Sequence, residues 1–279
     1  NSNDPANYRG ISLLCTAYKV MTKIVKNRLE TLTNDLINPL QFGFRKGRST
    51  TDAITNLLSS AKTAISKTRG KLYALFIDFR TAFDVVDRTH LLYKLATDFK
   101  LDRAMLSLIS CLLQMNTILF KHQQCQCGIF HGDKTEILQD SGVLQGDSLS
   151  PLLFLLFAND LIGFIKSKCP LTTTQMYADD TVIFSESATN LKLAITALDD
   201  WCSTNGIAIN LKKTKIMKFR RGGYLAKEDC FFWRGEAIEI VKDYVYLGIN
   251  FQTGLSFHRH VKQVCAKAKV GTMSRNVSK

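Results

Sequence analysis

The sequence predicts an α+β protein, and two observations lead to that prediction. Apolar residues recur at helical spacing in several segments of the chain. Between these segments lie short apolar runs, bounded by turn residues, of the kind that form buried strands. Because helices and strands follow one another in mixed order, we expect them to pack as layers around a common core.

The expected helices are marked by apolar spacing and by their end residues. In Lys19–Leu36, apolar residues return every three or four positions. Ser150 and Pro151 favour a helix start, since serine can cap a helix and proline suits its first position. Gly206 suits a helix end. The segments expected to be helical are 19–36, 51–66, 90–113 with a break near 100–102, 150–165, 191–202 and about 257–269.

The expected strands are short. We expect strands at 72–77, 215–219 and 244–251, a hairpin within 118–138, and a second hairpin at 176–184. The second hairpin turns at Ala178-Asp179-Asp180. The segment 41–49 is a glycine-punctuated basic loop.

The composition indicates a globular protein with room for a sizeable core and more than one lobe. The chain has 279 residues, of which 46% are apolar and 22% charged. Its longest apolar stretch, Pro151–Ile165, contains Asn159 and Asp160 and is too short for a membrane span, so we expect no membrane association. The eight cysteines lack paired zinc-site spacing and indicate reduced thiols in an intracellular protein. The chain shows no signal peptide and starts without methionine, so we expect a piece of a longer polypeptide.

Basic residues gather in the C-terminal part of a chain whose formal net charge is +13. The ten residues from Lys212 to Arg221 include six basic residues and no acidic one. No acidic residue follows Asp243. Such one-sided charge favours phosphate backbones, because binding releases their counterions. The alternatives are a solvated basic face and an anionic membrane surface.

Two sets of carboxylates stand next to buried strands. Asp78 follows the strand 72–77, and Asp179 with Asp180 occupies the hairpin tip. Carboxylates from separate strands can hold two cations about 3.5–4 Å apart, as two-metal phosphoryl transfer requires. Taken singly, each aspartate has a plainer explanation, as a turn residue or a strand end. Asp84 and Asp87 read better as helix caps or surface charges.

Seven sequence blocks, in order, resemble the reverse transcriptases, and more narrowly those of non-LTR (LINE-type) retrotransposons. The blocks cover residues 7 to 251 and are "NYRGISLL" at 7–14, "QFGFRKGRST" at 41–50, Asp78 with Ala82-Phe83, "SGVLQGDSLSP" at 141–151, "YADD" at 177–180, "INLKKTKIM" at 209–217 and "YLG" at 246–248. The resemblance implies a right-hand polymerase fold with an antiparallel palm sheet packed on helices. Residues 1–70 and 90–144 would form the fingers, 71–89 and 145–250 the palm, and 251–279 the start of a truncated thumb.

The resemblance also implies roles for single residues. Asp78, Asp179 and Asp180 would be catalytic; the first two would be the main ligands of two Mg²⁺ ions, with Mn²⁺ as a substitute. The Phe79 carbonyl would add a metal ligand. The residues implied to contact the nucleotide are Arg9, Phe83 as a steric gate, Gln145, Gly146 and Lys213. Those implied to contact nucleic acid are Arg45, Lys46 and Arg48 along the template and Tyr246, Leu247 and Gly248 as primer grip.

The implied activity is RNA-directed DNA synthesis, with an RNA template, a DNA primer and dNTPs as partners. Ser148 departs from the proline usual in the family. The lysine expected before Arg9 is missing, because the sequence begins too late to include it. Neither the endonuclease nor the zinc-knuckle region of the family is present in this segment. The implied location is the nucleus and a cytoplasmic ribonucleoprotein. Competing hypotheses are an RNA-dependent RNA polymerase, a decayed or domesticated nucleic-acid-binding domain, and a group II intron or telomerase relative. Phe83 and the alanine of YADD favour DNA synthesis.

Overall fold

The computed structural model describes residues 12–114, 117–121, 134–222 and 229–276. The chain divides into two compact units. The helical unit contains residues 1–37, 81–159 and 205–207, and the sheet unit contains 38–80, 160–204 and 208–279. The mixture of helices and strands confirms the predicted α+β class. The predicted division into fingers, palm and thumb follows polymerase function rather than packing, and it stays a prediction.

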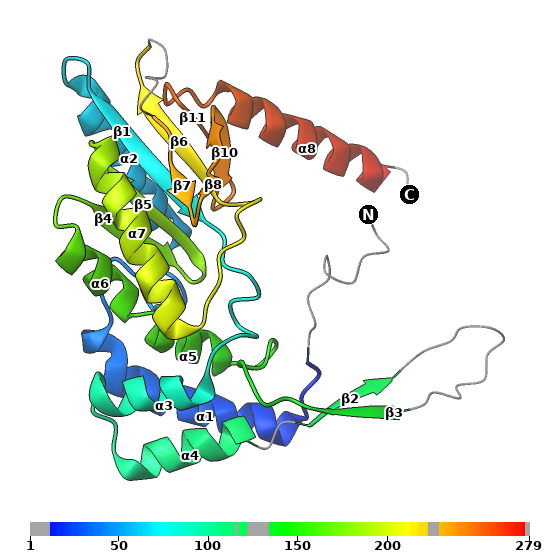
Figure 1. The fold of residues 1–279 in the computed structure, drawn as a ribbon. Coiled ribbons are helices and arrows are strands. Elements are labelled where there is room, and N and C mark those ends of the chain that lie inside the picture. The colour runs from blue at the N-terminus through cyan, green and yellow to red at the C-terminus, as the bar shows by residue number, and fades with distance from the viewer. Residues whose placement is uncertain (1–11, 115–116, 122–133, 223–228, 277–279) are drawn as a thin grey trace. The chain divides into compact units, whose positions relative to one another are not determined.

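The sheet unit is built on five strands in the order β4-β5-β1-β6-β9 (Figure 1). β1 (Lys71–Ile77) is central and pairs antiparallel with β5 on one side and β6 on the other, whereas β6 and β9 are parallel. The remaining elements of this unit are α2 (Thr50–Ser66), α6 (Asp160–Lys168), β4 (Thr173–Tyr177), β5 (Asp180–Ser185), α7 (Ala188–Asn205), β6 (Lys215–Arg220), β7 (Phe232–Trp233), β8 (Glu236–Ala237), β9 (Ile240–Val241), β10 (Asp243–Tyr246), β11 (Ile249–Gln252) and α8 (His258–Asn276).

β1 is buried on both faces, which explains its unbroken apolar sequence. Its even-numbered residues, such as Ala74 and Phe76, join a core cluster with Leu57 of α2 and Phe251 of β11. On the odd-numbered face, Tyr73 contacts Phe231 at 5.8 Å between ring centroids. This double burial anchors the strand whose end carries Asp78.

Among its described residues, the helical unit contains four α-helices, a short 3₁₀ helix and one antiparallel strand pair. They are α1 (Thr16–Thr33), η2 (Asn34–Leu36), α3 (Arg88–Thr97), α4 (Arg103–Gln114), β2 (Thr117–Lys121), β3 (Lys134–Leu138) and α5 (Ser150–Phe157). Asp87 caps α3 by accepting a hydrogen bond from the backbone N–H of His90, as predicted. The break near 100–102 is also confirmed, and Lys100 there has a φ of 51°.

Two expected elements differ from the structure. The helix expected at 150–165 is two helices, α5 and α6, separated at Ala158 and Asn159. Ser150 is the first helical residue rather than the cap, because Leu149 occupies the cap position; the first N–H groups of a helix have no intrahelical partner, so Pro151 fits in the first turn. The strand expected at 244–251 is a hairpin of β10 and β11, because Leu247 and Gly248 both take positive φ and reverse the chain.

The stretch Ser150–Lys168 is, within the described residues, long and apolar enough to cross a membrane by length and composition. Inside the protein 61% of it is buried. Core helices meet the same criteria, and we interpret α5 and α6 as core helices.

Candidate active site

The pairing of β1 with β5 brings the two sets of carboxylates to the same end of the sheet. Ile77 lies opposite Thr181, so in the same antiparallel register the next positions along are Asp78 and Asp180. Tyr177 pairs with Asp180 across the β4–β5 hairpin. The hairpin turn therefore consists of only Ala178 and Asp179, whereas the sequence predicted a tip that also included Asp180; Asp180 is the first residue of β5. Asp78 and Asp179 are half-buried, and Asp180 is exposed.

The turn itself has an unusual backbone. Ala178 has a φ of 59°, whereas Asp179 does not take a positive φ. Positive φ at the first of two turn residues is the pattern of a type II′ turn, where glycine is the usual residue. An alanine in this region costs energy that surrounding structure must supply.

Residues 40–43 supply part of that support. The backbone N–H of Met176 donates to the Leu40 carbonyl at 2.9 Å, and the N–H of Phe42 donates to the Met176 carbonyl at 2.8 Å. The side-chain oxygen of the buried Gln41 accepts hydrogen bonds from the N–H groups of Gly43, at 3.0 Å, and Ala178, at 3.3 Å. The sequence analysis treated this segment as a basic loop along the template path and missed its contact with the turn.

Gly43 packs directly against the carboxylate turn. A Cβ atom at this position would lie 2.1 Å from the backbone nitrogen of Ala178. No side chain fits at that distance, so glycine here permits close approach of two backbones.

The segment 209–215 wraps around the end of β1. The N–H of Asn210 donates to the Asp78 carbonyl at 2.7 Å, and the N–H of Asp78 donates to the hydroxyl of Thr214 at 3.3 Å. These bonds place Lys213 beside Asp78, with 3.9 Å between its Nζ and Asp78 Oδ2. The Lys213 side chain is 68% exposed, so this ion pair is weak and the ammonium group is free to meet a phosphate.

Phe79 forms an antiparallel bridge with Ile209. The flanking hydrogen bonds run from Arg80 N–H to the Ala208 carbonyl and from Asn210 N–H to the Asp78 carbonyl. In such a pair, the backbone groups of the bridged residue itself face away from its partner. The Phe79 carbonyl therefore faces the β5 side of β1, where the hairpin carboxylates lie.

Tyr244 of β10 is a neighbour of these carboxylates that the sequence reasoning missed. Its ring stacks on Phe76, with centroids 4.3 Å apart. Burial, followed by the negative charges of Asp180 and Asp78, raises the pKa of Tyr244 to about 12. The phenol therefore stays neutral at physiological pH. No sequence motif marked Tyr244, because its closeness to the carboxylates depends on how the β10–β11 hairpin packs against the end of β1.

The donor atoms at this end of the sheet fit a hard divalent cation. Carboxylate oxygens and a backbone carbonyl are the ligands that Mg²⁺ accepts, usually with water completing the coordination. Within the described part of the chain, no three His, Cys, Asp or Glu side chains stand ready as a metal cluster. The fit therefore rests on the type of donor and on the strand register.

The helical unit holds three of the predicted nucleotide-contacting residues. Phe83 is half-buried and stacks on Phe154 with centroids 4.8 Å apart. The side-chain amide of Gln145 donates to the Asp84 carboxylate at 2.9 Å. Gly146 is exposed, with a φ of 114°. Arg9 lies outside the described residues.

The predicted nucleic-acid contacts fall on the basic loop and on the β10–β11 turn. Lys46 and Arg48 are exposed, whereas Arg45 donates to the Asn38 carbonyl at 3.1 Å and braces the loop. Tyr246 is only 3% exposed and lies in the core. Leu247 and Gly248 form the turn, so a primer-grip role for this block, which stays a prediction, falls to the turn rather than to the Tyr246 ring.

Comparison with solved structures shows the class of fold. The chain is similar to apo telomerase from Candida tropicalis, with a TM-score of 0.57, 14% identity, and coverage of 87% of this chain and 40% of that one. A form of that telomerase truncated from its C-terminal domain gives a TM-score of 0.54 at 15% identity, with coverage of 87% and 44%. At such identities the likeness shows the fold alone, and it agrees with the predicted polymerase fold.

Residues 1–251 match the family "Reverse transcriptase (RNA-dependent DNA polymerase)". The chain belongs to this family. Its curated relatives include RNA-directed DNA polymerases and other proteins of non-LTR retrotransposons. It is 29% identical to the RNA-directed DNA polymerase from mobile element jockey of Drosophila melanogaster, over 97% of this chain and 30% of the relative. It is 25% identical to a putative 115 kDa protein of the type-1 retrotransposable element R1DM of the same species, over 98% and 26%. The chain thus spans less than a third of these relatives.

Proposed function

We propose that this chain is the catalytic core of an RNA-directed DNA polymerase of a non-LTR retrotransposon, adding dNTPs to a primer 3′-hydroxyl on an RNA template by a two-metal reaction. The observation that carries the proposal is the β1–β5 register, which sets Asp78 beside the two-aspartate hairpin. Two separate strands thereby present carboxylates at the same end of the sheet, as metal-assisted phosphoryl transfer requires.

Each carboxylate has a distinct part in the proposed reaction. Asp78 and Asp179 would hold the metals together with the Phe79 carbonyl, while Asp180, which is exposed, would add negative charge and keep the hairpin in register. Two Mg²⁺ ions, when bound, lower the pKa of the primer hydroxyl and stabilise the leaving pyrophosphate. Mn²⁺ is a plausible substitute because it also takes oxygen ligands.

Lys213 and Tyr244 complete the proposed site in the sheet unit. The ammonium group of Lys213 stands beside Asp78 and is positioned to meet the phosphates of an incoming nucleotide. Tyr244 is held neutral, so its hydroxyl can donate a hydrogen bond without adding charge near the carboxylates.

The nucleotide and nucleic-acid contacts are also proposals. Phe83 is suited to a steric gate because stacking on Phe154 holds its ring in one orientation. The Gln145 amide is oriented by Asp84, Gly146 permits close backbone approach, and Arg9 binds the triphosphate. Lys46 and Arg48, with Arg45 as a brace, follow the template, and the turn at Leu247 and Gly248 supports the primer. A nuclear and ribonucleoprotein location accords with such a reaction.

Primer extension tests the proposal. The chain should extend a DNA primer on an RNA template with dNTPs and Mg²⁺, and Asp179→Asn should reduce synthesis by at least about a thousandfold. RNA binding by the variant should remain nearly unchanged, because the substitution leaves the basic surface intact. Chelation by EDTA should abolish synthesis, and added Mg²⁺ should restore it. Normal synthesis by Asp179→Asn would exclude the two-metal assignment.

The same assay separates the alternatives. Incorporation of NTPs in preference to dNTPs would identify an RNA-dependent RNA polymerase instead. RNA binding without any extension, by wild type and variant alike, would favour a domain that binds nucleic acid without catalysis. The intact aspartates and Gln145 argue against that last reading.

A further inference from the structure

A basic pocket, separate from the carboxylate site, lies at the opposite end of β1 from Asp78. A pocket of about 250 Å³ is lined there by nine residues, six of them cationic: Lys67, Arg69, Lys71, Lys218, Arg220 and Arg221. Asp78 follows Lys71 by seven residues, so the two sites are roughly 23 Å apart along the strand at about 3.3 Å per residue. The pocket is therefore separate from the carboxylate site.

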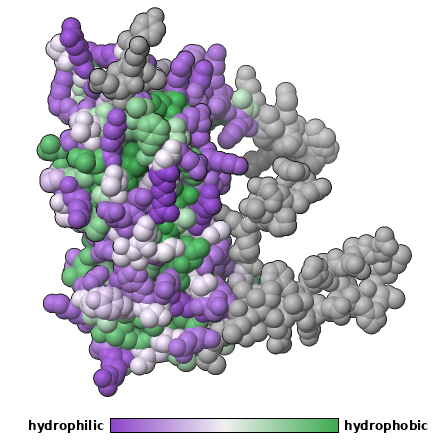
Figure 2. All heavy atoms as spheres, in the orientation of Figure 1, coloured by the Kyte–Doolittle hydropathy of each residue, from purple (hydrophilic) through white to green (hydrophobic). Residues whose placement is uncertain are grey.

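The register of the sheet explains why the cations converge. Lys71, the first residue of β1, lies directly opposite Arg220, the last residue of β6. Arg221 directly follows β6, while Arg69 comes from the tight turn between α2 and β1. Hydrophilic side chains gather over this end of the sheet unit, around the α2–β1 turn (Figure 2).

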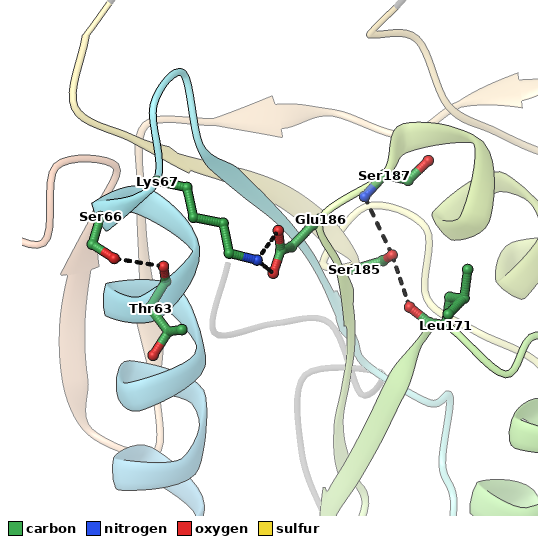
Figure 3. Close-up of polar contacts among 7 residues, drawn as sticks. All are labelled: Thr63, Ser66, Lys67, Leu171, Ser185, Glu186 and Ser187. Atoms are coloured by element: carbon green, nitrogen blue, oxygen red, sulfur yellow. Dashed lines mark hydrogen bonds and ion pairs between the residues drawn. The ribbon is translucent and has the colours of Figure 1, made fainter.

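Two of the six cations are neutralised by carboxylates. Lys218 and Tyr73 both donate hydrogen bonds to the carboxylate of Asp229, which is buried beside the pocket. Lys67 reaches from the end of α2 to both carboxylate oxygens of Glu186, at 2.6 and 2.7 Å (Figure 3). Neighbouring hydroxyls bond to backbone groups: Ser66 to the Thr63 carbonyl, and Ser185 to the Leu171 carbonyl.

The other four cations have no carboxylate partner within the described residues. Lys71 instead faces the Tyr73 ring, 5.3 Å from its centroid. One guanidinium nitrogen of Arg220, Nη1, is buried and has no hydrogen-bond partner in the described structure. A buried charged donor without a partner is costly, and an anion entering the pocket would satisfy it.

The backbone at Arg69 is strained in the conformation that brings this side chain to the pocket. Arg69 takes a φ of 56°, which a non-glycine residue rarely adopts. The next residue must be glycine, since a Cβ on Gly70 would lie 1.9 Å from the Ala64 carbonyl oxygen. Cations near the C-terminus of α2 are also stabilised by the helix dipole. The dipole does not explain Arg220 at the end of β6 or Arg221 directly after it.

We propose that this pocket binds a backbone phosphate of the RNA template, at a point outside the catalytic site. Guanidinium groups suit phosphate because their planar fork matches its oxygens. The pocket is smaller than the roughly 300–1,000 Å³ sites that hold whole small molecules, so it fits one phosphodiester group. A concave site of this size does not suit a flat membrane surface. The identity of the ligand as RNA rests on the proposed function; the anion site itself does not.

Binding measurements at several salt concentrations test the proposal without requiring catalysis. The probe is a single-stranded RNA of about 40 nucleotides, titrated between about 50 and 200 mM salt. The pocket variant is Arg69→Gln/Arg221→Gln, both at exposed positions. The control, Lys23→Gln/Lys62→Gln, removes the same charge from exposed positions outside the pocket. We expect the pocket variant to bind RNA roughly tenfold more weakly than the control variant. The slope of its log affinity against log salt concentration should be shallower by about one to two phosphate contacts.

Two further comparisons make the outcome decisive. Adding Arg220→Gln should deepen the loss, and thermal melting of each variant shows whether it is folded. Equal losses in the pocket and control variants, or no RNA binding by the wild type, would overturn the proposal. So would a pocket variant that loses binding to phosphatidylserine vesicles but keeps its affinity for RNA, since that would identify a lipid headgroup as the ligand. Absence of primer extension by the wild type would count against the proposed function alone.

Discussion

Two of the short hairpins in the sheet unit, β4–β5 and β10–β11, have turns that are built in different ways. The β4–β5 turn, Ala178-Asp179, takes a strained backbone with no glycine and is held by residues 40–43 from elsewhere in the chain. The β10–β11 turn, Leu247-Gly248, carries its own glycine, and nothing lies within 4 Å of a Cβ added to it. The first turn is held by a distant segment of the chain, whereas the second has a glycine at one of its two positions with positive φ.

The contrast has a functional meaning. A turn that presents metal ligands must hold them in one geometry, because small displacements of reacting groups are costly. The support from Gln41 and Gly43 supplies that constraint at the carboxylate turn. The second turn is free to keep an ordinary hairpin conformation, which places Tyr244 on the adjoining strand beside the carboxylates.

The largest effect should come from Gly43→Ala. The added methyl group would meet the Ala178 backbone nitrogen at 2.1 Å, so either the carboxylate turn or the 40–43 segment must move. We expect primer extension to fall by about a hundredfold or more, because a displacement of about 1 Å can cost that much. Stability should also fall, by about 1–3 kcal/mol, as in other overpacked sites.

Gly163→Ala is the matched control, because its Cβ meets nothing within 4 Å and the position is helical. It should keep full activity. If Gly43→Ala also kept full activity and an unchanged melting temperature, the supporting role of this segment would be refuted.

A smaller effect is expected from Gly248→Ala. The position has a φ of 83° but open space around it, so only backbone strain opposes the alanine. We expect a loss of about 1 kcal/mol in the free energy of unfolding, measured by urea denaturation. A loss as large as that of Gly43→Ala would show that the second turn is also constrained by contacts.

The smallest effect concerns Tyr244 of the second hairpin, whose pKa responds to burial and to the charge of Asp180 in the first hairpin. Burial and the charges of Asp180 and Asp78 raise its pKa from 10.0 to about 12, so the folded state keeps the proton that the unfolded chain releases first. The stability that depends on this proton is fully present below pH 10 and is lost as the pH rises towards 12. Tyr244→Phe should make the alkaline loss of stability shallower across that window.

Denaturation of both proteins at a series of alkaline pH values measures this difference. Some alkaline loss should persist in the variant, because burial also raises the pKa of Tyr18 to about 12. Identical curves for the two proteins would mean that the pKa of Tyr244 is not raised in the folded state.

The sequence alone determined the helices and strands with local signals. Apolar spacing located α1, α2 and α7, and Gly206 marked the end of α7. Ordered motifs identified the family, and strand ends followed by aspartates indicated which carboxylates to consider together. Such features depend on a few neighbouring residues, so they can be found without knowing the fold.

Tertiary structure decided the rest. Only pairing of β1 with β5 aligns Asp78 with Asp180, only the approach of residues 40–43 explains Gln41 and Gly43, and only the β1–β6 register brings Lys71 to Arg220. These contacts join residues far apart in the sequence. Their energies depend on burial and distance, which no local pattern encodes, and for that reason the support of the turn and the basic pocket emerged only from the folded chain.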